Sequence, residues 1–387
     1  MKLVRSLAIA LSCLAPACLV LDDGPKSSTS RSPTDPTVKD VAALEKLRDQ
    51  LEEGRTVALD KGAGELDARG NVLFYRTYPG YSPALHRLDR DGKKITYEFS
   101  IGAGDDANVR LTEAAVATAQ RQGSHVAYRV YDASTTGSLL GSTEFPAPGG
   151  EEKWSAYALA GTTLYVVTTP TDKIAGHTVW SLVPGGVAQK LFTLEEAGIK
   201  VGEFLDFDVE GSTLVLIESG RLWAVDVNNK RAKFLQNKWE ISGSVYFSAD
   251  GVVWEDAKGL KYLPYATNEV RDVSQEIAGS DFKINATYAK AHYFDHATSH
   301  ENFTRYKNAV VYTGNQGIFA YDLERKRVAP VLLDVAKDDG TRVDYRYPVV
   351  LDDGTAFFVG LTSEDGAVGA DGPVYRKNIA AIVAGAT

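Results

Sequence analysis

Hydrophobic and polar residues alternate in short stretches from Arg55 to the end of the chain, and a polar turn, usually with a glycine, precedes each stretch. Such alternation is typical of β-strands that bury one face. Seven strands of this kind follow a turn, and their turn residues are Gly70, Gly123, Gly161, Gly211, Gly251, Asn308 and Gly354. The pattern predicts a repeating unit built from strands.

A second pattern, a strand, a polar turn and another strand, recurs downstream of five of these turns and predicts hairpins. The five hairpins cover residues 84–99, 178–192, 221–235, 259–273 and 317–333. Successive turns lie on average about 47 residues apart, and repeats of about 40 to 50 residues with four strands each are typical of propeller blades. We therefore predict an all-β, seven-bladed β-propeller over residues 55–387, with six or eight blades as alternatives.

Two segments match known propeller repeats most clearly. They are RLWAVDV at residues 221–227 and GIFAYDL at residues 317–323. In these segments the chain resembles WD-repeat-like and quinoprotein-like propellers, although it lacks a Gly-His and Trp-Asp pair in every repeat. A closed ring requires the two ends of the body to meet. We therefore expect residues 56–59 to add a strand to the last blade, which contains residues 373–383.

Two different segments precede the strands. Residues 18–36 are rich in Ser, Thr, Pro, Asp and Gly, which predicts a flexible tether. Residues 37–54 are predicted to form one helix because apolar residues recur there at helical spacing. These residues are Val41, Leu44, Leu47 and Leu51. The helix either docks on the following domain or binds a partner.

The first residues have the pattern of an export leader. Lys2 and Arg5 precede an apolar run over residues 7–17, and small residues precede Cys18. The run is shorter than the roughly 20 apolar residues that cross a membrane, so residues 1–17 are predicted to be a signal peptide.

A cysteine directly after the cleavage point resembles a bacterial lipoprotein, and the resemblance implies lipidation at Cys18. By the same resemblance, Leu19 favours anchoring in the outer membrane. The family prefers Leu where this chain has Ala15. Two alternatives remain open: lipidation at Cys13, and simple cleavage after Ala17 that releases a secreted protein.

The composition of the chain limits the classes of partner that it can bind. The chain of 387 residues carries a formal net charge of −9. Such an acidic surface argues against nucleic acid and against anionic lipid headgroups, so we expect membrane contact through a lipid anchor only. Both cysteines lie in the leader region. The body, which we expect to be monomeric, must therefore hold together without disulfides.

The strongest local chemical pattern is a histidine cluster. His292, His296 and His300 are spaced by four residues, and Asp295 lies among them. Imidazole nitrogens with a carboxylate suit Zn²⁺ or Cu²⁺, so these residues are a candidate metal site. The alternative is a polar surface loop that contains histidines.

A second candidate site is formed by two Tyr-Arg pairs. Tyr75-Arg76 and Tyr128-Arg129 each lie five and six residues after their turn. This spacing predicts equivalent positions in adjacent blades and a ligand patch for a sugar or a carboxylate. The alternative is packing between blades.

No phosphate-binding loop, no Gly-x-Ser-x-Gly elbow and no His-Glu-x-x-His motif occurs in the sequence. We therefore expect an exported binding or scaffold module for an envelope protein or a surface glycan, with no catalytic residue and no assigned cofactor. One alternative is a periplasmic or cell-surface hydrolase or lyase with its site at the mouth of the propeller channel. Another is a metal-binding protein that uses the histidine cluster.

Overall fold

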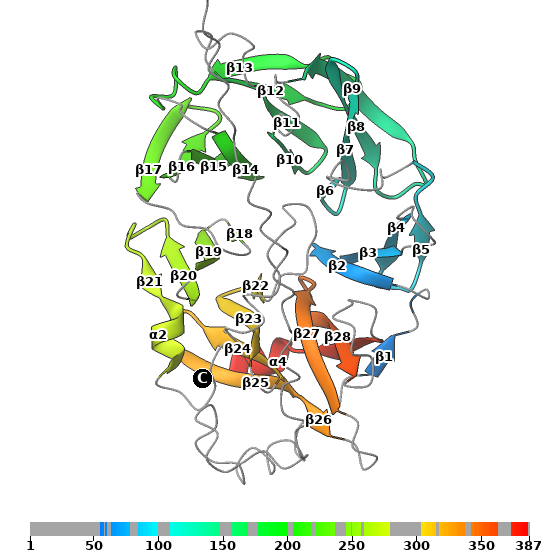
Figure 1. The fold of residues 1–387 in the computed structure, drawn as a ribbon, viewed down its shortest axis with the longest axis vertical. Coiled ribbons are helices and arrows are strands. Elements are labelled where there is room, and N and C mark those ends of the chain that lie inside the picture. Colours follow the sequence, from blue (N-terminus) through cyan, green and yellow to red (C-terminus); the bar gives the residue numbers. More distant parts are fainter. Residues whose placement is uncertain are drawn as a thin grey trace, which may run out of the picture.

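The computed structural model is a ring of seven antiparallel sheets, which confirms the predicted seven-bladed β-propeller (Figure 1). It describes residues 55–57, 59, 63–77, 84–99, 109–147, 156–168, 177–199, 204–218, 221–236, 245–248, 250–256, 259–278, 303–314, 317–336, 342–362 and 373–385. The leader, the tether, the predicted helix over residues 37–54 and Cys18 lie outside these residues.

Blades 1 to 3 each contain four strands in sequence order. Blade 1 consists of β2 (Ala63–Arg69), β3 (Val72–Thr77), β4 (Ala84–Asp89) and β5 (Lys94–Thr96). Blade 2 consists of β6 (Val109–Leu111), β7 (Ala115–Gln122), β8 (His125–Asp132) and β9 (Leu139–Pro146). Blade 3 consists of β10 (Ala156–Ala160), β11 (Thr163–Thr168), β12 (Thr178–Leu182) and β13 (Gln189–Thr193).

Blades 4 to 6 repeat this order. Blade 4 consists of β14 (Phe204–Glu210), β15 (Thr213–Glu218), β16 (Arg221–Asp226) and β17 (Arg231–Gln236). Blade 5 consists of β18 (Val245–Phe247), β19 (Gly251–Asp256), β20 (Gly259–Pro264) and β21 (Arg271–Asp272). Blade 6 consists of β22 (Phe303–Tyr306), β23 (Ala309–Gly314), β24 (Gly317–Asp322) and β25 (Arg327–Leu333). All five predicted hairpins are present in these blades.

Blade 7 joins the two ends of the body. Its C-terminal strands are β26 (Val335–Ala336), β27 (Arg342–Val350), β28 (Thr355–Thr362) and β29 (Val374–Asn378). The strand β1 (Arg55–Val57) pairs antiparallel with β29, with Thr56 opposite Tyr375. The expected closing strand is therefore confirmed, although it begins at Arg55 and ends at Val57.

Blade 2 departs from the predicted alignment. The strand that follows Gly123 is β8, the third strand of its blade, whereas the strand that follows Gly70 is β3, the second strand of blade 1. The turn before the second strand of blade 2 has no glycine, because the Thr112 hydroxyl stabilises it by accepting a hydrogen bond from the Ala115 amide at 3.0 Å. The prediction that Tyr75-Arg76 and Tyr128-Arg129 occupy equivalent positions was therefore wrong.

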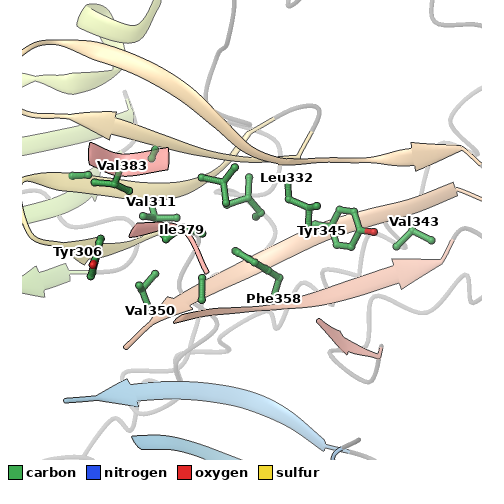
Figure 2. Close-up of a cluster of buried hydrophobic side chains, with 14 residues drawn as sticks. Tyr306, Val311, Leu332, Val343, Tyr345, Val350, Phe358, Ile379 and Val383 are labelled. Atoms are coloured by element: carbon green, nitrogen blue, oxygen red, sulfur yellow. The ribbon is translucent and has the colours of Figure 1, made fainter. Parts of the chain in front are cut away.

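Apolar side chains fill the space between neighbouring blades. Figure 2 shows the cluster between blades 6 and 7, where Val311 and Leu332 meet Tyr345 and Phe358. Each of the other six junctions has a cluster of its own. Since a four-stranded sheet has two faces to bury, this radial packing is what stabilises the ring in the absence of disulfides.

Two short helices among the described residues supplement the sheets. The helix α2 (Val273–Ala278) follows β21, and the Asp272 carboxylate caps it by accepting a hydrogen bond from the Gln275 amide at 3.0 Å. The helix α4 (Ala380–Gly385) follows β29 and buries Val383. Within the described residues, no helix has the length and hydropathy that a membrane crossing requires.

Candidate functional site

The predicted lipidation and metal sites cannot be placed on the fold. Cys18, His292, Asp295, His296 and His300 all lie outside the described residues. In the part of the chain that the structure describes, no three His, Cys, Asp or Glu side chains gather in a way that suits a metal ion. Metal binding by the histidine cluster therefore stays a prediction.

The two tyrosines of the predicted ligand patch lie in different blade junctions. Tyr75 is buried between blades 7 and 1, where its ring stacks on His86 with 4.8 Å between centroids. Tyr128 is buried between blades 2 and 3, where its ring meets the edge of Tyr157 at 5.4 Å. The two rings therefore do not share one exposed surface.

The two arginines of that patch also have different surroundings. Arg129 lies on β8 and donates a hydrogen bond to the Gln120 side chain at 3.2 Å. Arg76 is buried, and its positive charge acts on Asp67 and on Tyr157. Arg76 therefore belongs to a second group of polar residues that the sequence pattern did not identify.

This second group, which we call the inner-strand cluster, lies on the first three blades. Its members are Asp67, Arg69, Arg76, Arg110 and Tyr157. Asp67 and Arg69 come from β2, Arg110 from β6 and Tyr157 from β10. These three strands are the innermost strands of their blades and follow one another around the centre of the ring (Figure 1).

Direct contacts hold two separate pairs within the inner-strand cluster. Asp67 and Arg69 point to the same face of β2 because they are two residues apart, and their side chains form an ion pair at 3.1 Å. The Arg110 Nε atom donates a hydrogen bond across the blade junction to the Tyr157 carbonyl oxygen at 2.9 Å. The Arg110 guanidinium also lies 5.5 Å from the centroid of the Tyr157 ring, a cation-π contact.

The electrostatics of the inner-strand cluster follow from its partial burial. Burial raises the pKa of the Asp67 carboxyl and outweighs the opposing charges of Arg69 and Arg76. Burial likewise raises the pKa of the Tyr157 hydroxyl above its ordinary value, although Arg110 and Arg76 act against it. The charges of Arg69 and Arg76 thus act on a carboxylate that ionises less readily than usual.

A larger polar network joins blades 5 and 6 around α2. Arg271 forms a forked contact with the Glu276 carboxylate at 2.6 and 3.1 Å, and Tyr321 and Lys326 of blade 6 bond the same carboxylate. Burial opposes the ionisation of Glu276. The hydrogen bonds from Arg271, Tyr321 and Lys326 outweigh it and lower its pKa to about 2. Because these groups satisfy one another, we interpret this network as structural.

The third feature is a group of exposed apolar side chains on β9 of blade 2 and on the β12–β13 turn of blade 3. Leu139 at the start of β9 is 54% exposed, and Val183 and Val187 in the β12–β13 turn are 48% and 77% exposed. The Gly185 amide donates a hydrogen bond to the Leu140 carbonyl at 2.8 Å, which fixes this turn against β9. We call these three residues the outer apolar patch.

Sequence reasoning missed both the inner-strand cluster and the outer apolar patch. β6 is only three residues long, so no alternation marks it in the sequence. Val183 and Val187 lie within a hairpin that was correctly predicted, but their exposure depends on the neighbouring blade. The one available signal was the Pro184-Gly185-Gly186 turn between two valines.

Comparison with known proteins adds a likeness of fold. No protein-family model matches the sequence, and no curated protein matches it. A chain of the mitotic checkpoint complex is 11% identical, with 97% of this chain and 99% of that chain covered and a TM-score of 0.44. BamB from Moraxella catarrhalis is 14% identical, with 82% and 84% covered and a TM-score of 0.37.

A prolyl endopeptidase is 13% identical, with 84% of this chain and 49% of that chain covered and a TM-score of 0.43. The chain thus spans about half the length of that enzyme. At these identities the comparisons concern the fold alone.

Proposed function

We propose that this protein is an exported binding module, anchored by a lipid on Cys18, whose propeller binds another envelope protein through the outer apolar patch. The observation that carries the proposal is the exposure of Leu139, Val183 and Val187, where the turn that holds the two valines is bonded to the residue after Leu139. Single exposed apolar residues are ordinary on a protein surface, but a fixed group of them marks a contact surface for another protein.

The partner that suits this surface presents apolar side chains of its own. The turn that carries Val183 and Val187 is held against β9 by the hydrogen bond from Gly185 to Leu140. A surface that is already fixed loses little conformational freedom when it binds, which favours affinity. A protein surface supplies such complementary apolar side chains, whereas a glycan does so poorly.

The contacts of the described charged side chains favour a binding function over a catalytic one. The most buried ion pair in the described ranges joins Arg346 of β27 to Asp334, which lies between β25 and β26. In the described ranges we assign no side chain the role of a nucleophile activated by a neighbouring base. The alternative function is a periplasmic or cell-surface hydrolase or lyase with its site at the mouth of the propeller channel.

The experiment compares the tagged full-length protein with a variant that carries Leu139→Asp and Val187→Asp. Both are expressed in a bacterial host, and proteins that copurify from the envelope are identified by mass spectrometry. We expect one protein to copurify with the original chain and to be lost with the variant at equal yield and equal melting temperature. An identical set of copurifying proteins contradicts the proposal.

The anchor is tested separately with Cys18→Ala. We expect the original chain to sediment with membranes and to incorporate labelled palmitate, and the variant to do neither. Labelling that persists in the variant would contradict lipidation at Cys18 and would favour Cys13.

A further inference from the structure

The strand β9 is the last strand of its sheet, and Figure 1 shows it at the rim of the ring. Its eight residues make it longer than the last described strands of blades 1 and 3 to 6, which have two to seven residues. A long strand at a sheet edge invites pairing with another chain, and proteins commonly block it with lysine or proline. Such residues stand in β13, β17 and β25 as Lys190, Lys233 and Pro330. The strand β9 has no lysine or arginine, and its one proline, Pro146, is its last residue.

The backbone of β9 presents two residues to the outer edge. The Ala147 amide donates a hydrogen bond to the Ser124 carbonyl, next to β8, at 2.8 Å. Backbone groups point alternately to the two edges of an antiparallel strand. Within residues 141–145 the odd-numbered residues therefore bond β8. Ser142 and Glu144 consequently direct their amides and carbonyls away from β8.

The protein itself places one backbone partner on this edge. The Gly185 amide, in the β12–β13 turn, donates a hydrogen bond to the Leu140 carbonyl at 2.8 Å. This bond is the first rung of a ladder whose next positions are Ser142 and Glu144. The same turn carries the two valines of the outer apolar patch. A strand that continues the ladder therefore begins beside that patch.

The two faces of β9 select the kind of segment that fits. Phe145 is buried between blades 2 and 3, with its ring centroid 5.1 Å from that of Trp180, so the face that it shares with Thr143 points toward blade 3. Ser142 and Glu144 are exposed on the other face, and Glu144 is the one charged residue of β9. An added strand therefore suits apolar side chains on the first face and basic side chains on the second.

We propose that the partner supplies an extended segment of alternating apolar and basic residues, which adds to the outer edge of β9 as an antiparallel strand. The backbones of Ser142 and Glu144 exchange hydrogen bonds with two basic residues, and the Glu144 carboxylate pairs with the basic side chain opposite it. The apolar residues face blade 3 and the outer apolar patch. This inference rests on the proposed function, because the segment belongs to the protein that binds the patch.

The test uses a defined peptide, acetyl-Val-Lys-Val-Lys-Val-amide, in isothermal titration of the full-length protein. We expect the peptide to bind, and to bind more weakly as salt is added. Methylation of both lysine amide nitrogens removes the donors that face β9 and should abolish binding. Methylation of the central valine nitrogen alters an amide that points away from β9, so the affinity should stay within about twofold. Equal binding of the two methylated peptides, or no heat from the unmodified peptide, overturns the proposal.

Variants at one position assign the binding to the edge of β9. Ser142→Pro removes an amide from the outer edge and leaves the bonds between β8 and β9 in place. It should weaken peptide binding about fivefold or more, the size of one backbone hydrogen bond. Ser142→Ala keeps the amide and is the matched control, with unchanged affinity. Equal affinity of these two variants for the peptide overturns pairing at this edge.

A second variant keeps every backbone group. Glu144→Lys should weaken peptide binding about threefold or more, because it places like charges opposite each other. Glu269→Lys, at an exposed glutamate in blade 5, is the control and should bind as the original chain does. If melting shows that Ser142→Pro does not fold, this pair decides, and equal affinity of the two lysine variants overturns the proposal.

Copurification separates this inference from the proposed function. Ser142→Pro is compared with the variant that carries Leu139→Asp and Val187→Asp. A protein that is lost with the two aspartates but retained with Ser142→Pro supports the outer apolar patch and overturns strand addition. Peptide binding at β9, with no copurifying protein that depends on the patch, supports pairing at the edge and overturns the proposed function.

Discussion

Thr56 of β1 lies directly opposite Tyr375 of β29, so the first and the last strands of the body belong to one blade. The pairing continues on both sides, with Arg55 opposite Arg376 and Val57 opposite Val374. A ring closed in this way cannot lose either end without exposing a sheet edge and the adjacent blade junctions.

Deletion of residues 55–60 should therefore lower the melting temperature by roughly 5 °C or more, which corresponds to a loss of about 2 kcal/mol or more in a domain of this size. Deletion of residues 19–36, which precede the closing strand, is the control and should leave the melting temperature unchanged. Differential scanning calorimetry measures both. Equal melting of the two truncated proteins would contradict closure by β1.

Glu276 should make the protein sensitive to acid. Its pKa is about 2 in the folded protein against an ordinary value of 4.5. The contact network therefore stabilises the fold fully above about pH 5, and this contribution is lost as the pH falls toward 2. Glu276→Gln should lower the free energy of unfolding by about 2 kcal/mol at pH 7, a value that allows for partial solvent screening.

Urea unfolding at several pH values measures this effect. The Glu276→Gln variant should lose less stability than the original chain between about pH 5 and pH 2. Glu269→Gln, at an exposed glutamate in the same blade, is the control. If the free energy of unfolding depends on pH in the same way for the original chain and for Glu276→Gln, the neighbours of Glu276 do not lower its pKa.

Asp334 and Arg346 form an ion pair that is almost completely buried, since each side chain is 1% exposed and their atoms approach to 3.3 Å. Asp334→Ala should destabilise the protein by about 3 kcal/mol, because it removes one acidic partner of the buried Arg346 charge, which also pairs with Asp344. Removing both charges, with Asp334→Leu and Arg346→Met, should recover most of that loss.

The matched control for this pair is Arg90→Ala. Arg90 also pairs with an aspartate, Asp353 at 3.3 Å, but its side chain is 74% exposed. The control should cost less than about 1 kcal/mol. If Asp334→Ala and Arg90→Ala lower the free energy of unfolding equally in chemical unfolding, the buried pair does not stabilise blade 7.

The sequence predicted the blades because each turn and hairpin is a local pattern. Glycine with a positive φ stands at Gly70, Gly161 and Gly211, where it allows the tight turn between two strands. The prediction failed at blade 2, where Thr112 performs this role with its hydroxyl. It also missed α2, although Asp272 and Gln275 have the spacing of a helix cap.

The candidate sites were less predictable because they join residues far apart in the chain. Arg305 and Asp250, which pair at 3.1 Å, are 55 residues apart in sequence and meet only because blades 5 and 6 pack together. Arg110 and Tyr157 are 47 residues apart and meet in the same way. The predicted Tyr-Arg pairs were local in sequence, and local proximity did not bring Tyr75 near Tyr128.

Binding of a protein partner to the outer apolar patch is tested most directly by the affinity of the copurified partner for two variants. Val187→Asp places a charge in the patch, and Val270→Asp does the same at an exposed valine in blade 5. We predict that Val187→Asp weakens binding at least tenfold, since burial of a valine is worth about 1.5 kcal/mol or more. We also predict that Val270→Asp binds as the original chain does. Equal affinity of the two variants for the partner would contradict binding through the outer apolar patch.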